Sequence, residues 1–182
     1  IYKECGQLIA LIDDIMKLSR LDEGSEELSA ERVDLYDLSQ KILQELTPVA
    51  AKRGISLHME GGRQTIQGVW RILHEMIYNL CDNAIKYNKD GGAVTVRVTE
   101  EEDQVVVSVE DTGIGISEGQ QDRVFERFYR VDKSHSRRVG GTGLGLSIVK
   151  HGAQYHNAQL SLDSEPGAGT TITLRFPKQS AA

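Results

Sequence analysis

This sequence has few cysteines, no long apolar run and no net positive charge. Its two cysteines, Cys5 and Cys81, lie in helical patterns and share no spacing typical of a metal site. We therefore interpret them as buried or partly buried thiols in a reducing compartment. No stretch approaches the roughly 20 apolar residues that a membrane-spanning helix needs, and no signal-peptide pattern opens the chain, so we expect a soluble protein.

The formal net charge of −6 argues against general nucleic-acid binding, because phosphate backbones are bound by basic surfaces. Basic residues are instead concentrated in one segment, at Arg127, Arg130, Lys133, Arg137 and Arg138. Such a cluster suits a small polyphosphate better than a duplex. The length of 182 residues and the hydrophobic share of 39% fit one domain with a core and room for an appendage.

Glycines gather in two segments, DTGIGIS (residues 111–117) and GGTGLGLS (residues 140–147). Glycine allows positive φ and lets a ligand approach bare backbone, so the two segments can form two walls of one pocket. The second segment runs directly into LSIVKHGAQYH, which we interpret as a helix. Backbone N–H groups of a glycine loop at a helix N-terminus form a phosphate site, which leads to a nucleotide-binding hypothesis.

Residues 1–24 form an amphipathic helical pattern. Its apolar residues follow a four-three spacing, at Ile1, Cys5, Leu8, Ile12 and Ile15. Such a stripe needs a partner, and the chain begins without a cap or a methionine, so we expect a helix cut from something longer. An ordinary helix packed on its own core is the alternative. The acidic break after it favours a separable helix, with a linker at residues 25–31.

From residue 32 onward, helical patterns alternate with strands and hairpins. We expect helices at about residues 35–53, 69–87 and 146–156, short strands at 32–34, 55–59 and 65–67, and hairpins over 93–111 and 158–176. This order predicts an α+β fold: a two-layer sandwich of one mixed, mostly antiparallel sheet with helices on one face. The domain would span residues 32–178, with a short tail at 179–182.

The helix at about residues 35–53 places Leu38, Ile42, Leu46 and Val49 on one predicted face. Pro48 falls inside this helix. Because proline lacks a backbone donor and clashes with the preceding turn, we expect a kink or loosened last turns.

The helix at residues 69–87 has an apolar face, which we assign to Leu73, Met76, Ile77, Leu80, Cys81 and Ala84. Opposite it, Glu75, Asn79, Asn83 and Lys86 form one polar stripe. Asparagines are poor helix formers, but amide oxygens followed by a lysine can hold a hydrated Mg²⁺ and the phosphates it bridges. A solvated helix face is the alternative interpretation.

Asp111 ends a predicted strand immediately before Gly113 and Gly115. A carboxylate at this position can accept a hydrogen bond from the exocyclic amine of a purine, and the glycines leave space for the ring. A turn-capping aspartate is the alternative.

The segment between the glycine clusters combines cations with aromatic residues. Arg127, Arg130 and Lys133 surround Phe125, Phe128 and Tyr129 in a segment that we interpret as a mobile lid. Its cations can reach a terminal phosphate and offset charge in phosphoryl transfer. A basic loop on an apolar plug is the alternative.

Together, four segments in this order and spacing resemble the N, G1, F and G2 boxes of bacterial sensor histidine kinases. The segments are NLCDNAIKY (79–87), DTGIG (111–115), FERFYR (125–130) and GTGLGL (141–146). The resemblance covers about residues 32–177. It also extends backward, because LIDDIMKLSRLDEG (11–24) is similar to the end of the second helix of that family's dimerisation and phosphotransfer domain.

The resemblance implies the Bergerat ATP-binding fold, shared with gyrase, mismatch-repair ATPases and a heat-shock chaperone. It implies that Asn83 binds Mg²⁺ with Asn79 assisting, and that Lys86 and Arg130 contact phosphates. Asp111 would bind adenine. The remaining cofactor-binding residues that it implies are Tyr87, Gly113, Gly115, Tyr129, Lys133, Gly141, Thr142, Gly143, Leu144, Gly145 and Leu146. It assigns Gly167 and Gly169 to the last hairpin, in a structural role, and names Asn79, Lys86 and Arg130 as catalytic.

The sequence departs from the family at the phosphoacceptor, a histidine followed by an acidic residue and then Thr-Pro. None of His58, His74, His135, His151 and His156 stands in that setting, and QELTP (44–48) has glutamine where histidine is needed. We therefore expect the acceptor to precede residue 1, and we expect this chain to bind ATP without phosphorylating itself.

The resemblance further implies a response-regulator receiver domain as partner, a homodimer formed through the helical domain, and no nucleic acid. It implies a cytoplasmic domain of a protein anchored in the bacterial inner or plasma membrane by segments outside this chain. Two alternatives remain at this stage. Hydrolytic relatives place a glutamate four residues before the metal-binding asparagine, where this chain has Asn79, and an amide cannot act as a general base. The other alternative is a nucleotide-binding scaffold.

Overall fold

The computed structural model describes residues 12, 15–16, 29–131 and 142–178. Most of the predicted N-terminal helix and its linker lie outside the described residues, as does the tail at 179–182. The candidate phosphate ligands Lys133 and Gly141 also lie outside them, together with Arg137 and Arg138.

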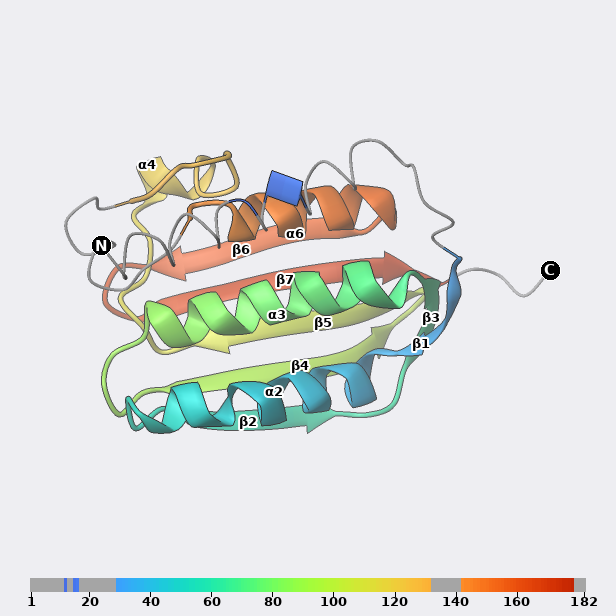
Figure 1. Ribbon diagram of the computed structural model, residues 1–182, viewed down its shortest axis with the longest axis horizontal. Helices are drawn as coiled ribbons and strands as arrows, with labels where there is room; N and C mark the ends of the chain where they lie inside the picture. The colour runs from blue at the N-terminus through green and yellow to red at the C-terminus, as the bar shows by residue number, and fades with distance from the viewer. Residues whose placement is uncertain (1–11, 13–14, 17–28, 132–141, 179–182) are drawn as a thin grey trace.

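One sheet of five strands carries the fold, with three helices on a single face (Figure 1). The strands are β2 (Ser56–Gly61), β4 (Ala93–Glu101), β5 (Gln104–Asp111), β6 (Gln159–Glu165) and β7 (Gly169–Pro177), in the order β2-β4-β5-β7-β6. The β2–β4 pair is parallel and the other pairs are antiparallel. The predicted mixed, mostly antiparallel sheet and both predicted hairpins are confirmed.

A second sheet corrects the prediction of a single one. Strands β1 (Glu31–Asp34) and β3 (Thr65–Gly68) occur where short strands were expected, but they pair with each other rather than with the main sheet. They lie at the end of the sandwich where α2 and α3 begin (Figure 1). Pairing with a distant strand is a tertiary choice, which the local alternation of such short segments does not encode.

Helix α2 (Leu35–Ala51) begins where predicted, because Asp34 caps it by accepting hydrogen bonds from the backbone N of Tyr36 at 2.9 Å and of Asp37 at 3.0 Å. It continues past Pro48 to Ala51. Its buried face includes Leu38, Ile42 and Leu46 as expected. The assignment of Val49 to the buried face was wrong. Val49 is 42% exposed, and Ala50, one position further along the helix, is buried instead.

Helix α3 (Trp70–Lys86) lies between α2 and α6 (Gly145–Tyr155) on the sheet (Figure 1). All six residues predicted for its apolar face are buried, with Ile72 and Ile85 in addition. Alternate valines of the central strands, such as Val96 and Val107, are fully buried beneath the helices. A four-residue helix, α4 (Glu118–Gln121), follows the first glycine segment and was not predicted.

Candidate nucleotide-binding site

The polar stripe of α3 faces the second glycine segment. Glu75, Asn79, Asn83 and Lys86 are all half-buried. A Cβ atom built on Gly145, the first residue of α6, would lie 2.8 Å from Asn79 Oδ1 and 3.6 Å from Asn83 Nδ2. A side chain at Gly145 would therefore crowd the Asn79 amide and touch the Asn83 amide, and the glycine keeps the space beside them open.

Two hydrogen-bonding partners hold the polar stripe in place. Asn79 Nδ2 donates to the Glu75 backbone oxygen at 2.7 Å, which leaves the Asn79 amide oxygen directed toward Gly145. Lys86 Nζ forms an ion pair of 2.5 Å with Asp82 Oδ2, one turn earlier on α3. The sequence analysis missed Asp82, although the i, i+4 spacing of these opposite charges was visible in it.

The first glycine segment packs against the chain directly after the C-terminal end of α3. A Cβ atom on Gly113 would overlap the Tyr87 backbone oxygen and lie 2.7 Å from Asp111 Oδ1. Ile114 N donates to that same Tyr87 oxygen at 3.1 Å. The loop that carries Asp111 is therefore attached directly to the C-terminal end of the helix that carries Asn83 and Lys86.

The Asp111 carboxylate is held in a desolvated position. Its Oδ1 accepts a hydrogen bond from Gly113 N at 2.8 Å. Burial raises the pKa of Asp111 to about 6, although hydrogen bonds from the backbone of Gly113 and Thr170 oppose the shift. A desolvated carboxylate ionised at neutral pH is a strong acceptor for a ligand N–H group.

The final hairpin, β6–β7, packs against the first glycine segment. Gly167 N donates to Ile114 O at 2.8 Å, and Lys89 Nζ donates to Gly167 O. Gly115 adopts a φ of +68°, and a Cβ atom there would overlap the Glu165 backbone oxygen. The structural role expected for the last hairpin therefore has a physical basis in these contacts.

The aromatic and basic segment meets the second glycine segment through backbone contacts. Phe128 N donates to Gly143 O at 2.9 Å, and Phe128 has a φ of +64° with 57% of its surface exposed. Arg123 stacks over the Tyr129 ring at 4.3 Å from its centroid. A left-handed conformation in an exposed aromatic residue stores strain, which is common at ligand-binding segments.

Helix α6 begins at the second glycine segment, as predicted. Its N-cap residue is Leu144, whose side chain has no hydrogen-bond acceptor, in contrast to Asp34 at the start of α2. The first-turn N–H groups of α6 therefore keep the capacity to bind an anion. Thr142 Oγ1 accepts from Leu144 N at 3.3 Å and holds the loop at this entry.

The structure adds a buried residue that the sequence analysis did not assign. Asn88 is 4% exposed; its Nδ2 donates to Ala93 O at 2.9 Å, and its Oδ1 accepts from Lys89 N at 2.9 Å and from Thr112 Oγ1 at 3.2 Å. It joins the end of α3 to the start of β4 and to the loop after Asp111. Its hydrogen bond to Thr112, 24 positions further along the chain, could not be predicted from the sequence pattern.

Among the residues that the structure describes, no group of three or more acidic, histidine or cysteine side chains is arranged so that it could hold a metal ion. In the same described portion, no helix is long and apolar enough to cross a membrane.

Comparisons with known proteins agree with this geometry. The family described as histidine kinase-, DNA gyrase B-, and HSP90-like ATPase matches residues 68–180. SenX3, a sensor-like histidine kinase of Mycolicibacterium smegmatis, is 38% identical over 177 residues, which are 96% of this chain and 46% of that protein. This chain therefore spans about half the length of that relative.

Solved structures of histidine kinases share the fold. Full-length ShkA in complex with AMPPNP is 28% identical, with a TM-score of 0.84 over 98% of this chain and 38% of that chain. The mycobacterial sensor histidine kinase MprB is also 28% identical, with a TM-score of 0.71 over 81% of this chain and 97% of that chain. The resemblance to sensor histidine kinases is confirmed, and the chain belongs to the family of histidine kinase-, DNA gyrase B-, and HSP90-like ATPases.

Proposed function

We propose that this chain is the ATP-binding catalytic domain of a two-component sensor histidine kinase. One observation carries the proposal: both glycine segments lie close to α3 or to the residue that follows it, with Gly145 beside Asn79 and Gly113 beside the Tyr87 backbone oxygen. This closeness supports a site to which amide side chains, the partly buried Asp111 carboxylate and the N-terminus of α6 would all contribute.

The adenine and nucleoside end of the site would lie at the first glycine segment. Asp111 would accept a hydrogen bond from the exocyclic amine of adenine. Gly113 and Gly115 would line the base with their backbone, and Tyr87, which is 36% exposed, would pack near the nucleoside. Desolvation makes the Asp111 carboxylate selective, because a ligand that presents another acceptor there would leave it unpaired.

The phosphate end would lie between α3 and the start of α6. Asn83 would bind Mg²⁺ with Asn79 assisting; their half-buried amide groups, beside a space that a Cβ at Gly145 would fill, fit a hard cation that prefers oxygen ligands. When held there, Mg²⁺ would supply positive charge that offsets the negative charge of the phosphates. Lys86 would exchange its ion pair with Asp82 for a phosphate.

Backbone and lid groups would complete the triphosphate site. Arg130 would reach the phosphates from the aromatic segment, and Tyr129 would contact the ligand there. Backbone groups of the second glycine segment and its neighbours would line the phosphates, and we assign this role to Gly141, Thr142, Gly143, Leu144, Gly145 and Leu146. Lys133 would add a further cation.

The reaction we propose passes the γ-phosphoryl group to a histidine imidazole on a helix outside this chain, then to an aspartate on a response regulator. The imidazole nitrogen is already a nucleophile, so the site positions the reactants and neutralises charge. Asn79 stands where a hydrolytic relative needs a water-activating glutamate, and Glu75 lies a further turn back. We therefore expect slow hydrolysis.

The surrounding organisation is part of the same proposal. Residues 1–24 would be the end of the dimerisation and phosphotransfer helix, and residues 32–178 the catalytic domain. The intact protein would dimerise through its helical domain and be held at the bacterial membrane by segments outside this chain, with this domain in the cytoplasm.

Titration with a fluorescent ATP analogue in the presence of Mg²⁺ tests the proposal. We expect saturable binding, and we expect Asn83→Ala to weaken Mg²⁺-dependent binding by at least about tenfold, because it removes a metal ligand. Gln154→Ala, which removes an exposed amide from α6, is the matched control and should bind normally. Unchanged affinity in Asn83→Ala would remove the metal assignment, and no saturation by the unsubstituted chain would favour a scaffold.

A further inference from the structure

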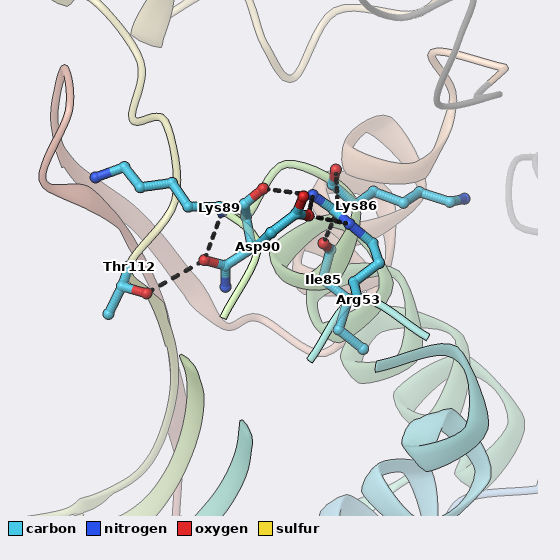
Figure 2. Close-up of polar contacts among 7 residues, drawn as sticks. Arg53, Ile85, Lys86, Lys89, Asp90 and Thr112 are labelled. Atoms are coloured by element: carbon cyan, nitrogen blue, oxygen red, sulfur yellow. Dashed lines mark hydrogen bonds and ion pairs between the residues drawn. The ribbon is translucent and has the colours of Figure 1, made fainter. Parts of the chain in front are cut away.

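The C-terminal end of α3 is held by the side chain of a residue outside that helix. Arg53 Nη1 donates to the backbone oxygens of Ile85 at 2.6 Å and Lys86 at 2.7 Å. Its Nη2 donates to the Asn88 backbone oxygen at 2.7 Å. Figure 2 shows the Arg53 guanidinium directed at the backbone oxygens of Ile85 and Lys86. The last carbonyls of a helix lack the donor of a following turn. The guanidinium supplies donors to them, and the Ile85 oxygen also accepts from Asn88 N at 3.3 Å.

The backbone around Arg53 is fixed on the same segment. Gly91 N donates to Arg53 O at 3.2 Å, and Ser56 N donates to Gly92 O at 2.9 Å. Gly54, with a φ of +63°, turns the chain from α2 into β2 and directs Arg53 toward the end of α3. Arg53 therefore contacts the turn between α3 and β4 through both its main chain and its side chain.

The carbonyl contacts carry more weight than the accompanying ion pair. Arg53 Nη2 lies 3.2 Å from Asp90 Oδ1, but the Asp90 side chain is 88% exposed, so that pair is screened by solvent. The Arg53 side chain is 33% exposed, and its positive charge sits at the negative end of the α3 dipole. Only a planar fork of donors can reach three carbonyls in this way, which distinguishes arginine from lysine.

The C-terminal end of α3, whose carbonyls accept from Arg53, leads directly into the candidate site. Lys86 and Tyr87 directly follow Ile85, whose backbone oxygen accepts from Arg53. Thr112 Oγ1 (Figure 2) donates to Asn88 Oδ1 at 3.2 Å and so connects the loop after β5 to this turn. The Tyr87 oxygen accepts from Ile114 N at 3.1 Å. A shift of the end of α3 would therefore move both the phosphate-binding lysine and the loop that carries Asp111.

We propose that Arg53 is a positioning residue for nucleotide binding: by holding the carbonyls of Ile85, Lys86 and Asn88 it fixes the end of α3 relative to the adenine-side loop. This inference rests on the proposed function. Arg53 acts through the backbone of the site and contacts no ligand itself.

Substitution of Arg53 tests the inference. The affinity for the fluorescent Mg-ATP analogue is measured well below the unfolding temperature of each variant. Arg53→Ala should bind the fluorescent Mg-ATP analogue about tenfold more weakly, because three charge-assisted hydrogen bonds to the end of α3 are lost. Arg53→Lys should recover part of the affinity. Arg97→Ala is the matched control. It removes an exposed arginine of β4 that forms an ion pair with Glu60 at 2.8 Å, and it should bind the analogue as the unsubstituted chain does.

Hydrogen exchange separates positioning from general destabilisation. In Arg53→Ala, amide exchange should accelerate at residues 86–92 and 111–114 while the centre of the sheet stays protected. Equal affinity of Arg53→Ala and the unsubstituted chain would overturn the inference alone, as would weakened binding accompanied by uniform loss of protection. Failure of the unsubstituted chain to bind would refute the proposed function and this inference with it.

Discussion

Asp111 is a residue at which folding and ligand binding make opposite demands. Its pKa is raised from 3.8 to about 6, so the folded chain favours the protonated carboxyl more than the unfolded chain does. The stability from this shift is fully present below about 3.8 and is lost as the pH rises through about 6. At neutral pH the ionised carboxylate therefore destabilises the fold, while in the proposed function it would accept a hydrogen bond from adenine.

Asp111→Asn should consequently raise the thermal unfolding midpoint at about pH 7.5 by several degrees. The amide keeps an oxygen for Gly113 N and carries no charge to desolvate. The difference in midpoint between variant and unsubstituted chain should narrow as the pH falls through about 6 toward about 4, where the native carboxyl is protonated in the folded state. Calorimetry at several pH values measures this, and a pH-independent difference would show that burial of the charge is not the cause.

At the residue scale, the sequence predicted the assignment of single residues to the candidate site better than the contacts between residues. The amide stripe of α3 followed from helical periodicity, and Asp111 followed from a strand ending at glycines. Arg53 could not be found, because it contacts carbonyls that lie 32 to 35 positions away along the chain, and main-chain acceptors leave no trace in residue type.

The β4–β5 hairpin shows strain at the scale of an element. Glu102, at the tip of the hairpin, has a φ of 48°, in the left-handed region that glycine adopts without steric cost. Glu102→Gly should raise the free energy of unfolding by about 0.5–1 kcal/mol in urea titrations. Asp103→Gly is the control, because Asp103 has no positive φ and glycine there should only destabilise the fold. Equal effects of the two substitutions would contradict this account of the turn.

Helices and strands could be predicted where a single periodicity of apolar residues dominated the local sequence. Both hairpins and the long helices fall within about two residues of their expected bounds, because alternation and helical periodicity act over short distances. The separate β1–β3 sheet and the parallel β2–β4 pair were not predictable in this way. Which strand pairs with which depends on packing against α2 and α3, which is a property of the assembled fold.

At the scale of the whole molecule, the sandwich gathers the site at one end. The C-terminal ends of α3 and β5 and the N-terminal end of α6 lie at the same side of the domain, opposite β1 and β3 (Figure 1). Elements distant in sequence thereby bring the amides of α3, the Asp111 carboxylate and the N-terminus of α6 to the same end of the domain, where the candidate site lies. The four motifs predicted this gathering through their order and spacing, but not the contacts between Gly145, Asn79 and Asn83 that produce it.

The fate of the γ-phosphoryl group of ATP tests the central claim most directly. We would replace residues 1–24 with a complete dimerisation and phosphotransfer domain that carries an acceptor histidine, and incubate the chimera with γ-labelled ATP and Mg²⁺. The account predicts acid-labile label on the protein, as expected for phosphohistidine, with little release of free phosphate and no label in the Asn83→Ala chimera. Rapid release of free phosphate without protein labelling would contradict it.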